Sequence, residues 1–136
     1  MRVEAGSAGL YASPGARPPA EALLVAREAG VDLTGHAAAL VTRDAFEAAD
    51  LVLVAERFQA AELGGLFPGD AGKIRLLSDF AAARHRGREI ADPFGLPLAH
   101  YRTSLEEIRE CVEGLVRALA CAGPLPQGSP PAADKS

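Results

Sequence analysis

Asp92 and Pro93 stand immediately before a long segment of helical periodicity. A carboxyl group held in the loop ahead of a helix can pass a proton to a reacting group, so Asp92 is a candidate general acid. An Asp-Pro pair is also common in loops that have no catalytic role. A general acid acts together with an attacking group, and the chain has few side chains that could supply one.

The thiol and imidazole groups of the chain do not form a recognisable chemical motif. Cys111 and Cys121 are too few for a disulfide framework or a zinc cluster. His36, His85 and His100 have no ligand spacing. We therefore expect neither a metal site nor a cofactor.

The composition is that of a globular domain of ordinary size. Of the 136 residues, 49% are apolar and 24% are charged, which is enough to build a core. Acidic residues outnumber basic ones by 18 to 14, which disfavours nucleic acid as a partner. The sequence contains neither an apolar run of about 18 residues nor a signal peptide. We expect no membrane association and a cytoplasmic location.

Apolar and β-branched runs alternate with segments of helical spacing. The run LVLVA, at Leu51–Ala55, has the composition of a strand buried on both faces, and KIRLL, at Lys73–Leu77, follows as a second strand. Arg2–Ala5 is a third, short candidate strand, and residues 37–41 are expected to be extended. Helices are predicted at residues 18–29, with Gly30 at the C′ position, at 42–49 and at 56–66. The alternation of strand and helix predicts an α/β fold with a parallel sheet.

The last helix has the clearest pattern in the chain. Its apolar residues recur at intervals of three and four and form one stripe: Leu98, Tyr101, Leu105, Ile108, Val112, Leu115 and Leu119. After residue 122 the chain becomes rich in proline and small polar residues. We therefore predict one domain over residues 1–122 and a disordered Pro-rich tail over 123–136.

In order along the chain, several stretches resemble low-molecular-weight protein tyrosine phosphatases. The stretches are VEAGSAG, GVDLTGHAAALVT, ADLVLVAERF, KIRLLSDF, IADPFG and YRTSLEEI. The stretches SAGLYASP and DPFG are similar to those of the bacterial protein-arginine-phosphatase branch of the family. The resemblance implies a three-layer α/β/α fold with a parallel sheet, hydrolysis of phosphotyrosine or phosphoarginine, and a phosphorylated protein as substrate.

The resemblance also implies roles for five residues. Asp92 matches the family's general acid, which protonates the departing group. Ser7 and His36 match residues that support the phosphate-binding loop, and Tyr11 and Phe94 are candidates for lining the leaving-group side of the pocket. Taken alone, these residues are a turn serine, a surface histidine and aromatic residues of a core or its rim.

The attacking part of the family's site has no counterpart in these residues. That part is a strand, a loop with a cysteine, five residues, an arginine and Ser or Thr, and a helix, in which the thiolate attacks phosphorus and the arginine holds its oxygens. Cys111 and Arg117 have the required spacing, but they are predicted to lie within a helix, where six residues rotate by about 240°. Residue 118 is alanine, and Glu113 would repel a phosphate dianion. We expect that the chain lacks the first strand, phosphate loop and first helix, and is inactive as written.

Losing a central strand would leave an open sheet edge, which invites association with another chain. The first expectation is an incomplete segment of a cysteine-dependent protein phosphatase, either from a misassigned start or from a decayed gene. The alternative is a non-catalytic pseudophosphatase that binds a partner, or a second copy, through the open edge. An arsenate reductase is less favoured, because residues 55–91 contain none of the redox cysteines that this chemistry requires.

Overall fold

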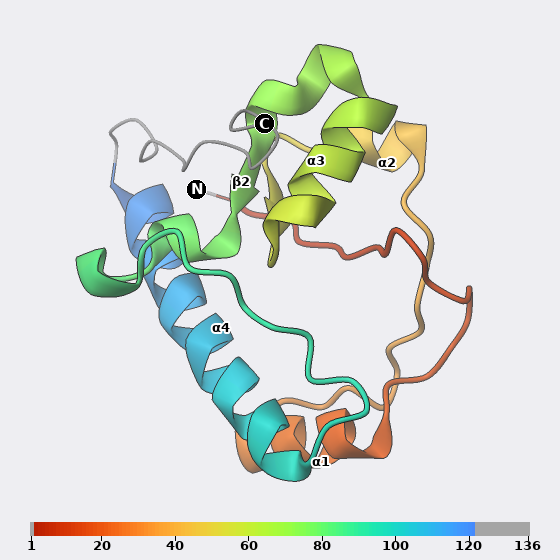
Figure 1. The fold of residues 1–136 in the computed structure, drawn as a ribbon, viewed down its shortest axis with the longest axis vertical. Coiled ribbons are helices and arrows are strands. Elements are labelled where there is room, and N and C mark those ends of the chain that lie inside the picture. The colour runs from red at the N-terminus through yellow and green to blue at the C-terminus, as the bar shows by residue number, and fades with distance from the viewer. Residues whose placement is uncertain (1, 122–136) are drawn as a thin grey trace. The chain divides into compact units, whose positions relative to one another are not determined.

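The computed structural model describes residues 2–121, which form two compact units (Figure 1). The first unit contains residues 2–42 and 92–105, and the second contains residues 43–91 and the chain from residue 106. The predicted tail at 123–136 lies outside the described residues. The single domain predicted over residues 1–122 stays a prediction.

Helix α1, Ala20–Glu28, is the first helix of the first unit. Pro19 precedes it, and Gly30 ends it with a φ of 82°, a conformation that glycine adopts without strain. The N–H of Gly30 donates to the carbonyl of Arg27, and the N–H of Val31 donates to the carbonyl of Ala26. The predicted helix and its terminal glycine are both confirmed.

The predicted strand at Arg2–Ala5 is wrong, because residues 2–8 are exposed and belong to no strand. A strand needs a neighbour to bond its N–H and C=O groups, and residues 2–8 form no β-bridge with any described segment. Pairing begins at Gly9, whose parallel bridge to Leu40 is closed by bonds of 2.8 and 3.0 Å to Ala39 and Val41. The extended conformation predicted for residues 37–41 is confirmed by this pairing.

The second unit contains a parallel pair of strands. Strand β1, Val52–Val54, pairs with β2, Ile74–Leu76, in the register Val52 to Ile74 and Val54 to Leu76. Helix α3, Arg57–Leu66, and a 3₁₀ segment, Pro68–Lys73, connect them, as a parallel pair requires. Both predicted strands, their parallel direction and the helix between them are confirmed.

The start of α3 is fixed by Gln59. The side-chain oxygen of Gln59 accepts the N–H groups of Ala55 and Glu56, both at 3.0 Å. A residue three positions into a helix can bond back to the chain in this way and satisfy N–H groups that the helix leaves open. The bonds therefore set the point at which β1 ends and α3 begins.

Helix α2, Arg43–Ala48, confirms the short helix predicted at residues 42–49 and is held by Lys73. The Lys73 ammonium donates to the carbonyls of Phe46 and Ala49 at 2.5 and 2.8 Å, and it lies 4.6 Å from the centre of the Phe46 ring. A cation is favoured at the C-terminal end of a helix, where carbonyl groups lack partners. The buried Phe46 ring also stacks on Phe67, with 4.5 Å between the ring centres.

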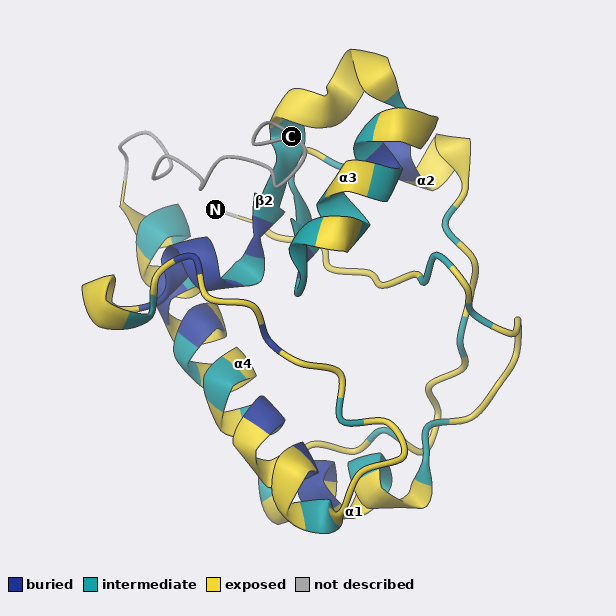
Figure 2. Ribbon diagram, in the orientation of Figure 1, coloured by how far each residue is buried: buried dark blue, intermediate teal, exposed yellow. Residues whose placement is uncertain are grey.

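Helix α4, Leu98–Ala120, has the extent that the sequence predicts but only part of its predicted buried face (Figure 2). Its buried positions are Tyr101, Ser104, Cys111 and Gly114. Ile108 and Val112, both members of the predicted apolar stripe, are exposed, at 37% and 41%. Tyr101 belongs to the predicted stripe, whereas within the second unit the buried positions of α4 are the small residues Cys111 and Gly114.

At Gly114, helix α4 lies close to a neighbouring backbone segment. A Cβ atom added there would lie 1.7 Å from the carbonyl oxygen of Phe80, in a 3₁₀ helix at Leu77–Phe80 that follows β2. Cys111, one turn earlier, packs with Ala81 and Ile90 in a buried cluster. The helix therefore rests on the backbone after β2, and a side chain at position 114 would force the two apart.

We predict that Gly114→Ala destabilises the protein by about 2 kcal/mol or more, because overpacking against a backbone carbonyl cannot be relieved by a rotamer change. Urea unfolding measures the loss. The matched control is Gly65→Ala in α3, where an added Cβ meets no atom within 4 Å. It should be neutral or stabilising by up to about 1 kcal/mol. Equal effects of the two changes would contradict the close contact.

Candidate functional site

Asp92 lies in a tight turn just ahead of α4. Its Oδ1 atom accepts the N–H of Phe94 at 3.0 Å, and the N–H of Leu96 donates to the carbonyl of Pro93 at 2.9 Å. Gly95 has a φ of 80°, which reverses the chain before the helix. The carboxylate is exposed, and its second oxygen has no hydrogen-bond partner among residues 2–121. Asp92 is thus oriented by one oxygen and open at the other.

The first turns of α4 are joined to α1 within the first unit. The Arg102 guanidinium donates to both Glu28 oxygens, at 3.0 and 2.8 Å. This bidentate bond lowers the pKa of Glu28 below its ordinary value, and the same partner raises the pKa of Arg102. The pair therefore anchors the helix that follows the Asp92 turn.

His36 lies on an exposed turn, where its backbone N–H donates to the carbonyl of Leu33 at 3.0 Å. Just before it, Asp32 Oδ1 accepts the hydroxyl and the N–H of Thr34, at 2.6 and 2.9 Å. The hydroxyl bond, and next the N–H bond, lower the pKa of Asp32. The turn that carries His36 is therefore fixed by its own side chains.

The other three residues singled out from the sequence are also exposed. Ser7 lies in the segment without regular structure, and residues Tyr11 and Phe94 are 75% and 73% exposed. Within residues 2–121, no hydrogen bond joins Ser7, His36 or Asp92 to one another. All five residues lie in the first unit.

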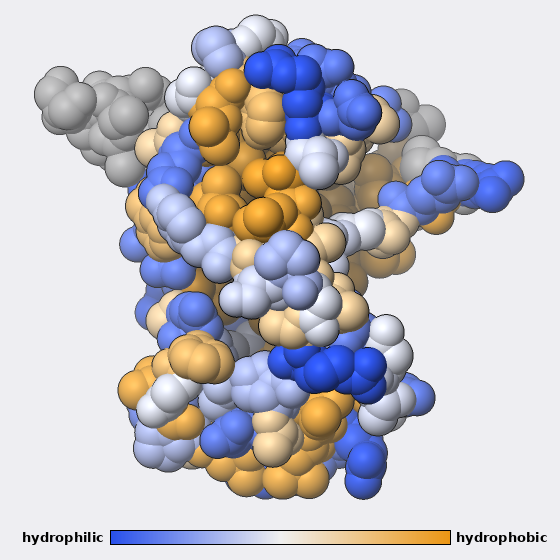
Figure 3. Space-filling model, turned by 90° about the vertical axis from the view of Figure 1, so that its right-hand side faces the viewer, coloured by the Kyte–Doolittle hydropathy of each residue, from blue (hydrophilic) through white to orange (hydrophobic). Residues whose placement is uncertain are grey.

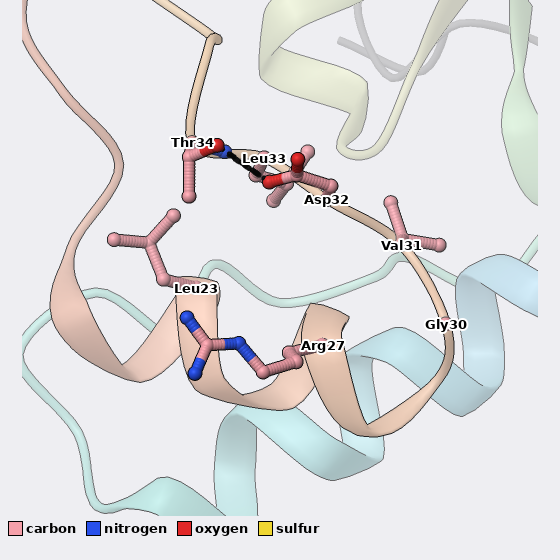
Figure 4. Close-up of a pocket in the computed structure, with 7 residues that line it drawn as sticks. All are labelled: Leu23, Arg27, Gly30, Val31, Asp32, Leu33 and Thr34. Atoms are coloured by element: carbon pink, nitrogen blue, oxygen red, sulfur yellow. Dashed lines mark hydrogen bonds between the residues drawn. The ribbon is translucent and has the colours of Figure 1, made fainter.

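A cavity of about 270 Å³ lies between α1 and the segment after it (Figure 4). Leu23 and Arg27 line it from the helix, and Val31, Leu33 and the bonded pair Asp32–Thr34 line it from the other side. None of the five residues singled out above lines this cavity. It lies beside the His36 turn, and no cysteine lines it.

Cys111 and Arg117 both lie inside α4, as the sequence predicts. The thiol is buried, which raises the pKa of Cys111, and the charges of Glu110 and Glu107 raise it further. A thiol with a raised pKa is largely protonated at neutral pH and is a poor nucleophile. The N–H groups of this part of the helix are bonded to helix carbonyls and cannot hold a phosphate.

In the second unit, three bonds tie the chain ahead of Asp92 to the start of α3. Glu89 accepts the N–H of Arg57 at 2.7 Å, and the Arg57 guanidinium donates to the carbonyl of Gly87 at 2.7 Å. The N–H of Ile90 donates to the carbonyl of Ala55 at 3.0 Å. The sequence analysis missed this clamp, because its partners lie at least 30 positions apart and only an arginine at a helix start hints at it.

Between residues 2 and 121, no group of three or more His, Cys, Asp and Glu side chains is placed to hold a metal ion. None of the helices in that range is both long enough and apolar enough to span a bilayer.

Comparison with known proteins identifies relatives over most of the chain. Residues 1–123 match the family model described as "Low molecular weight phosphotyrosine protein phosphatase". The chain is 26% identical over 119 residues to the protein-arginine-phosphatase of Bacillus subtilis strain 168, which covers 88% of this chain and 77% of that protein. It is 28% identical over 117 residues to a probable low molecular weight protein-tyrosine-phosphatase, EpsP, of Ralstonia nicotianae, covering 86% of this chain and 77% of the relative.

Solved structures agree with these relatives. The arginine phosphatase YwlE of Geobacillus stearothermophilus aligns with a TM-score of 0.77 at 27% identity, over 85% of this chain and 73% of that one. The tyrosine phosphatase AmsI of Erwinia amylovora aligns with a TM-score of 0.75 at 29% identity, over 82% and 71% of the two chains.

We predict that the Glu28–Arg102 pair makes the protein's stability depend on pH. The folded-state pKa of Glu28 is lowered from 4.5, so its contribution is complete above that value and is lost as the pH falls through the lower folded pKa. Glu28→Gln should therefore destabilise the protein at pH 7 and have less effect at pH 3. Urea unfolding at the two pH values measures the difference, with Glu21→Gln, in the first turn of α1, as the control. An equal loss of unfolding free energy at both pH values would contradict the lowered pKa of Glu28.

Proposed function

The chain belongs to the low molecular weight phosphotyrosine protein phosphatase family, and from this premise we propose that its residues form the proton-donating side of a cysteine-dependent phosphomonoesterase site. The observation that carries the proposal is the turn at Asp92. A carboxylate with one oxygen bonded to its own loop and the other free, just ahead of a long helix, is suited to transfer a proton.

Asp92 would protonate the atom that leaves phosphorus. Because Oδ1 accepts the Phe94 N–H at 3.0 Å, the proton to be given belongs on Oδ2. Supplying that proton stabilises the negative charge that develops on the leaving group as its bond to phosphorus breaks. The exposed position of Asp92 gives a bulky phosphoprotein access to the carboxyl group.

Four other residues are proposed to contact the phosphate-binding loop or the substrate. Ser7 and His36 would bond to a phosphate-binding loop, and their exposed side chains have no hydrogen-bond partner in the described part of the chain. Tyr11 and Phe94 offer exposed rings against which the substrate's side chain would pack. The substrate would be a protein carrying phosphoarginine or phosphotyrosine, the groups named for the relatives.

The attacking group is absent from these 136 residues. The two cysteines are Cys111 and Cys121, and only Cys111 has an arginine six positions later. Cys111 lies in α4 with a raised pKa and bonded backbone groups around it. We propose that the 136-residue chain by itself does not hydrolyse phosphomonoesters, and that its active form needs a thiolate loop that these residues do not contain.

We predict that the purified 136-residue chain shows no turnover of p-nitrophenyl phosphate above the buffer rate. Cys111→Ser should leave this baseline unchanged, because the thiol is not a nucleophile. Absorbance of p-nitrophenolate measures the rate. Turnover that iodoacetamide or Cys111→Ser abolishes would contradict the proposal.

We predict that Asp92 donates a proton to the leaving group once a cysteine-containing phosphate loop is joined to the chain. A chimera would carry the strand, cysteine-containing loop and helix of the Bacillus subtilis relative ahead of Arg2. In it, Asp92→Asn should lower kcat for phenyl phosphate by about 10²- to 10⁴-fold, because phenolate needs a proton to depart. The loss for p-nitrophenyl phosphate should be smaller, because p-nitrophenolate departs readily without one.

Asp44→Asn, at the start of α2, is the matched control and should leave both rates unchanged. Equal losses for the two substrates on Asp92→Asn would show a structural role for Asp92 and contradict proton donation.

A second candidate function is association with another chain through apolar surface. Ile108, Val112 and Val116 of α4 are 37%, 41% and 58% exposed, at the spacing of one helix face. Figure 3 shows that apolar side chains reach the surface on the face that it draws. Strands β1 and β2 pair only with each other, so each also has an edge without a partner among the described residues. A chain with these features is suited to bind a second copy or a partner protein without catalysis.

We predict that the chain forms a dimer or larger species in light scattering after size exclusion, at concentrations where Val112→Asp with Val116→Asp is monomeric. The matched control is Val3→Asp, at a valine that is 61% exposed outside α4. A monomeric wild-type chain at high concentration would exclude self-association through α4.

A further inference from the structure

The cavity between α1 and the segment after it has apolar walls that a ligand can reach. Leu23 and Leu33 are half-buried and Val31 is 47% exposed, so each of the three keeps accessible surface. The volume is about 270 Å³, slightly below the range of about 300 to 1,000 Å³ that is usual for small-molecule sites. The size therefore favours a ligand with few heavy atoms.

Two side chains of opposite charge line this cavity, one on each side (Figure 4). Arg27 belongs to α1, and Asp32 belongs to the segment that faces the helix. In residues 2–121 the Arg27 guanidinium has neither a hydrogen bond nor an ion pair. The bonds from Thr34, and also the charge of Arg27, lower the pKa of Asp32. The two charges are thus near enough to interact but do not touch.

The Asp32 carboxylate is held in place by one oxygen, which leaves the other open. Its Oδ1 atom accepts both the hydroxyl and the backbone N–H of Thr34, whereas Oδ2 has no hydrogen-bond partner in the described part of the chain. The Arg17 guanidinium donates to the Thr34 carbonyl and so holds the same segment. Oδ2 is therefore a positioned acceptor with unused capacity.

The described lining of the cavity contains no charged side chain besides Arg27 and Asp32. Glu28, the neighbour of Arg27 in the sequence, is outside this lining and is bound to Arg102 by two hydrogen bonds. A ligand with one positive and one negative group would match both charges of the cavity. A ligand with a single charge would leave either the guanidinium or the carboxylate without a counterpart.

We propose that this cavity binds a free α-amino acid with a branched aliphatic side chain. The ligand's carboxylate would accept hydrogen bonds from Arg27, because the planar guanidinium can bond both carboxylate oxygens. Its ammonium would donate to Oδ2 of Asp32. Its side chain would pack against Leu23, Val31 and Leu33. The site uses none of the residues proposed for phosphate chemistry, so it is independent of the phosphatase proposal.

Isothermal titration of the 136-residue chain with L-leucine tests the site. Three analogues each lack one part of this ligand: isoamylamine lacks the carboxylate, isocaproate lacks the ammonium, and glycine lacks the side chain. We expect saturable binding of L-leucine and binding of each analogue that is weaker by about fivefold or more. In amide NMR spectra of the labelled chain, L-leucine should shift the signals of Gly30, Val31 and Asp32.

Two variants test the charged groups separately. Arg27→Gln and Asp32→Asn should each weaken L-leucine by about fivefold, the size of one partly exposed charge pair. Asparagine keeps an oxygen that can accept the bonds from Thr34, and Arg27 is an exposed helix residue without a partner to lose. The matched control is Arg84→Gln, at an exposed arginine of the second unit, which should leave the affinity unchanged.

Four results would overturn the site: no saturable binding of L-leucine, equal affinity for isoamylamine or isocaproate, unchanged affinity in Arg27→Gln, or equal weakening by Arg84→Gln. Equal affinity for glycine would overturn the role of the apolar wall. If Asp32→Asn lowers the unfolding midpoint in urea, Arg27→Gln decides whether the charges bind the ligand.

Discussion

The close approach between Gly114 and the Phe80 carbonyl is the contact on which the second unit depends. An added Cβ atom would lie 1.7 Å from that oxygen, so the helix and the backbone meet where a side chain would otherwise stand. The contact places Cys111 against Ala81 and Ile90 in one buried cluster. The packing of one glycine thus decides which face of α4 is buried.

This packing has a chemical consequence for the thiol that it buries in α4. Burial in α4 keeps the Cys111 thiol protonated, because desolvation disfavours the thiolate. Asp92 is exposed in a turn that leaves one carboxylate oxygen free. The proposed division of the site rests on these two observations: the Cys111 thiol is buried, and one carboxylate oxygen of Asp92 is free of hydrogen bonds within the described residues.

Elements set by local sequence could be predicted, and those set by distant partners could not. The strands at Val52–Val54 and Ile74–Leu76, the helices between residues 20 and 66 and the extent of α4 follow from apolar runs, periodicity and Gly30. The strand predicted at Arg2–Ala5 failed because a strand exists only with a neighbour, which local composition does not reveal.

The buried face of α4 was misjudged for a similar reason. Periodicity marks the large apolar residues, whereas the contact with Phe80 selects the small ones, Cys111 and Gly114. For the site, the position of Asp92 before α4 was predictable, but the bond from Phe94 and the clamp of Arg57 on Gly87 and Glu89 required the coordinates.

The central claim is that this chain holds a proton donor but no attacking sulfur. Intact-mass spectrometry of the 136-residue chain, acid-quenched after incubation with excess p-nitrophenyl phosphate, tests it most directly. The account predicts an unmodified mass at every time point. A species heavier by one phosphoryl group, mapped to Cys111 or Cys121, would contradict it.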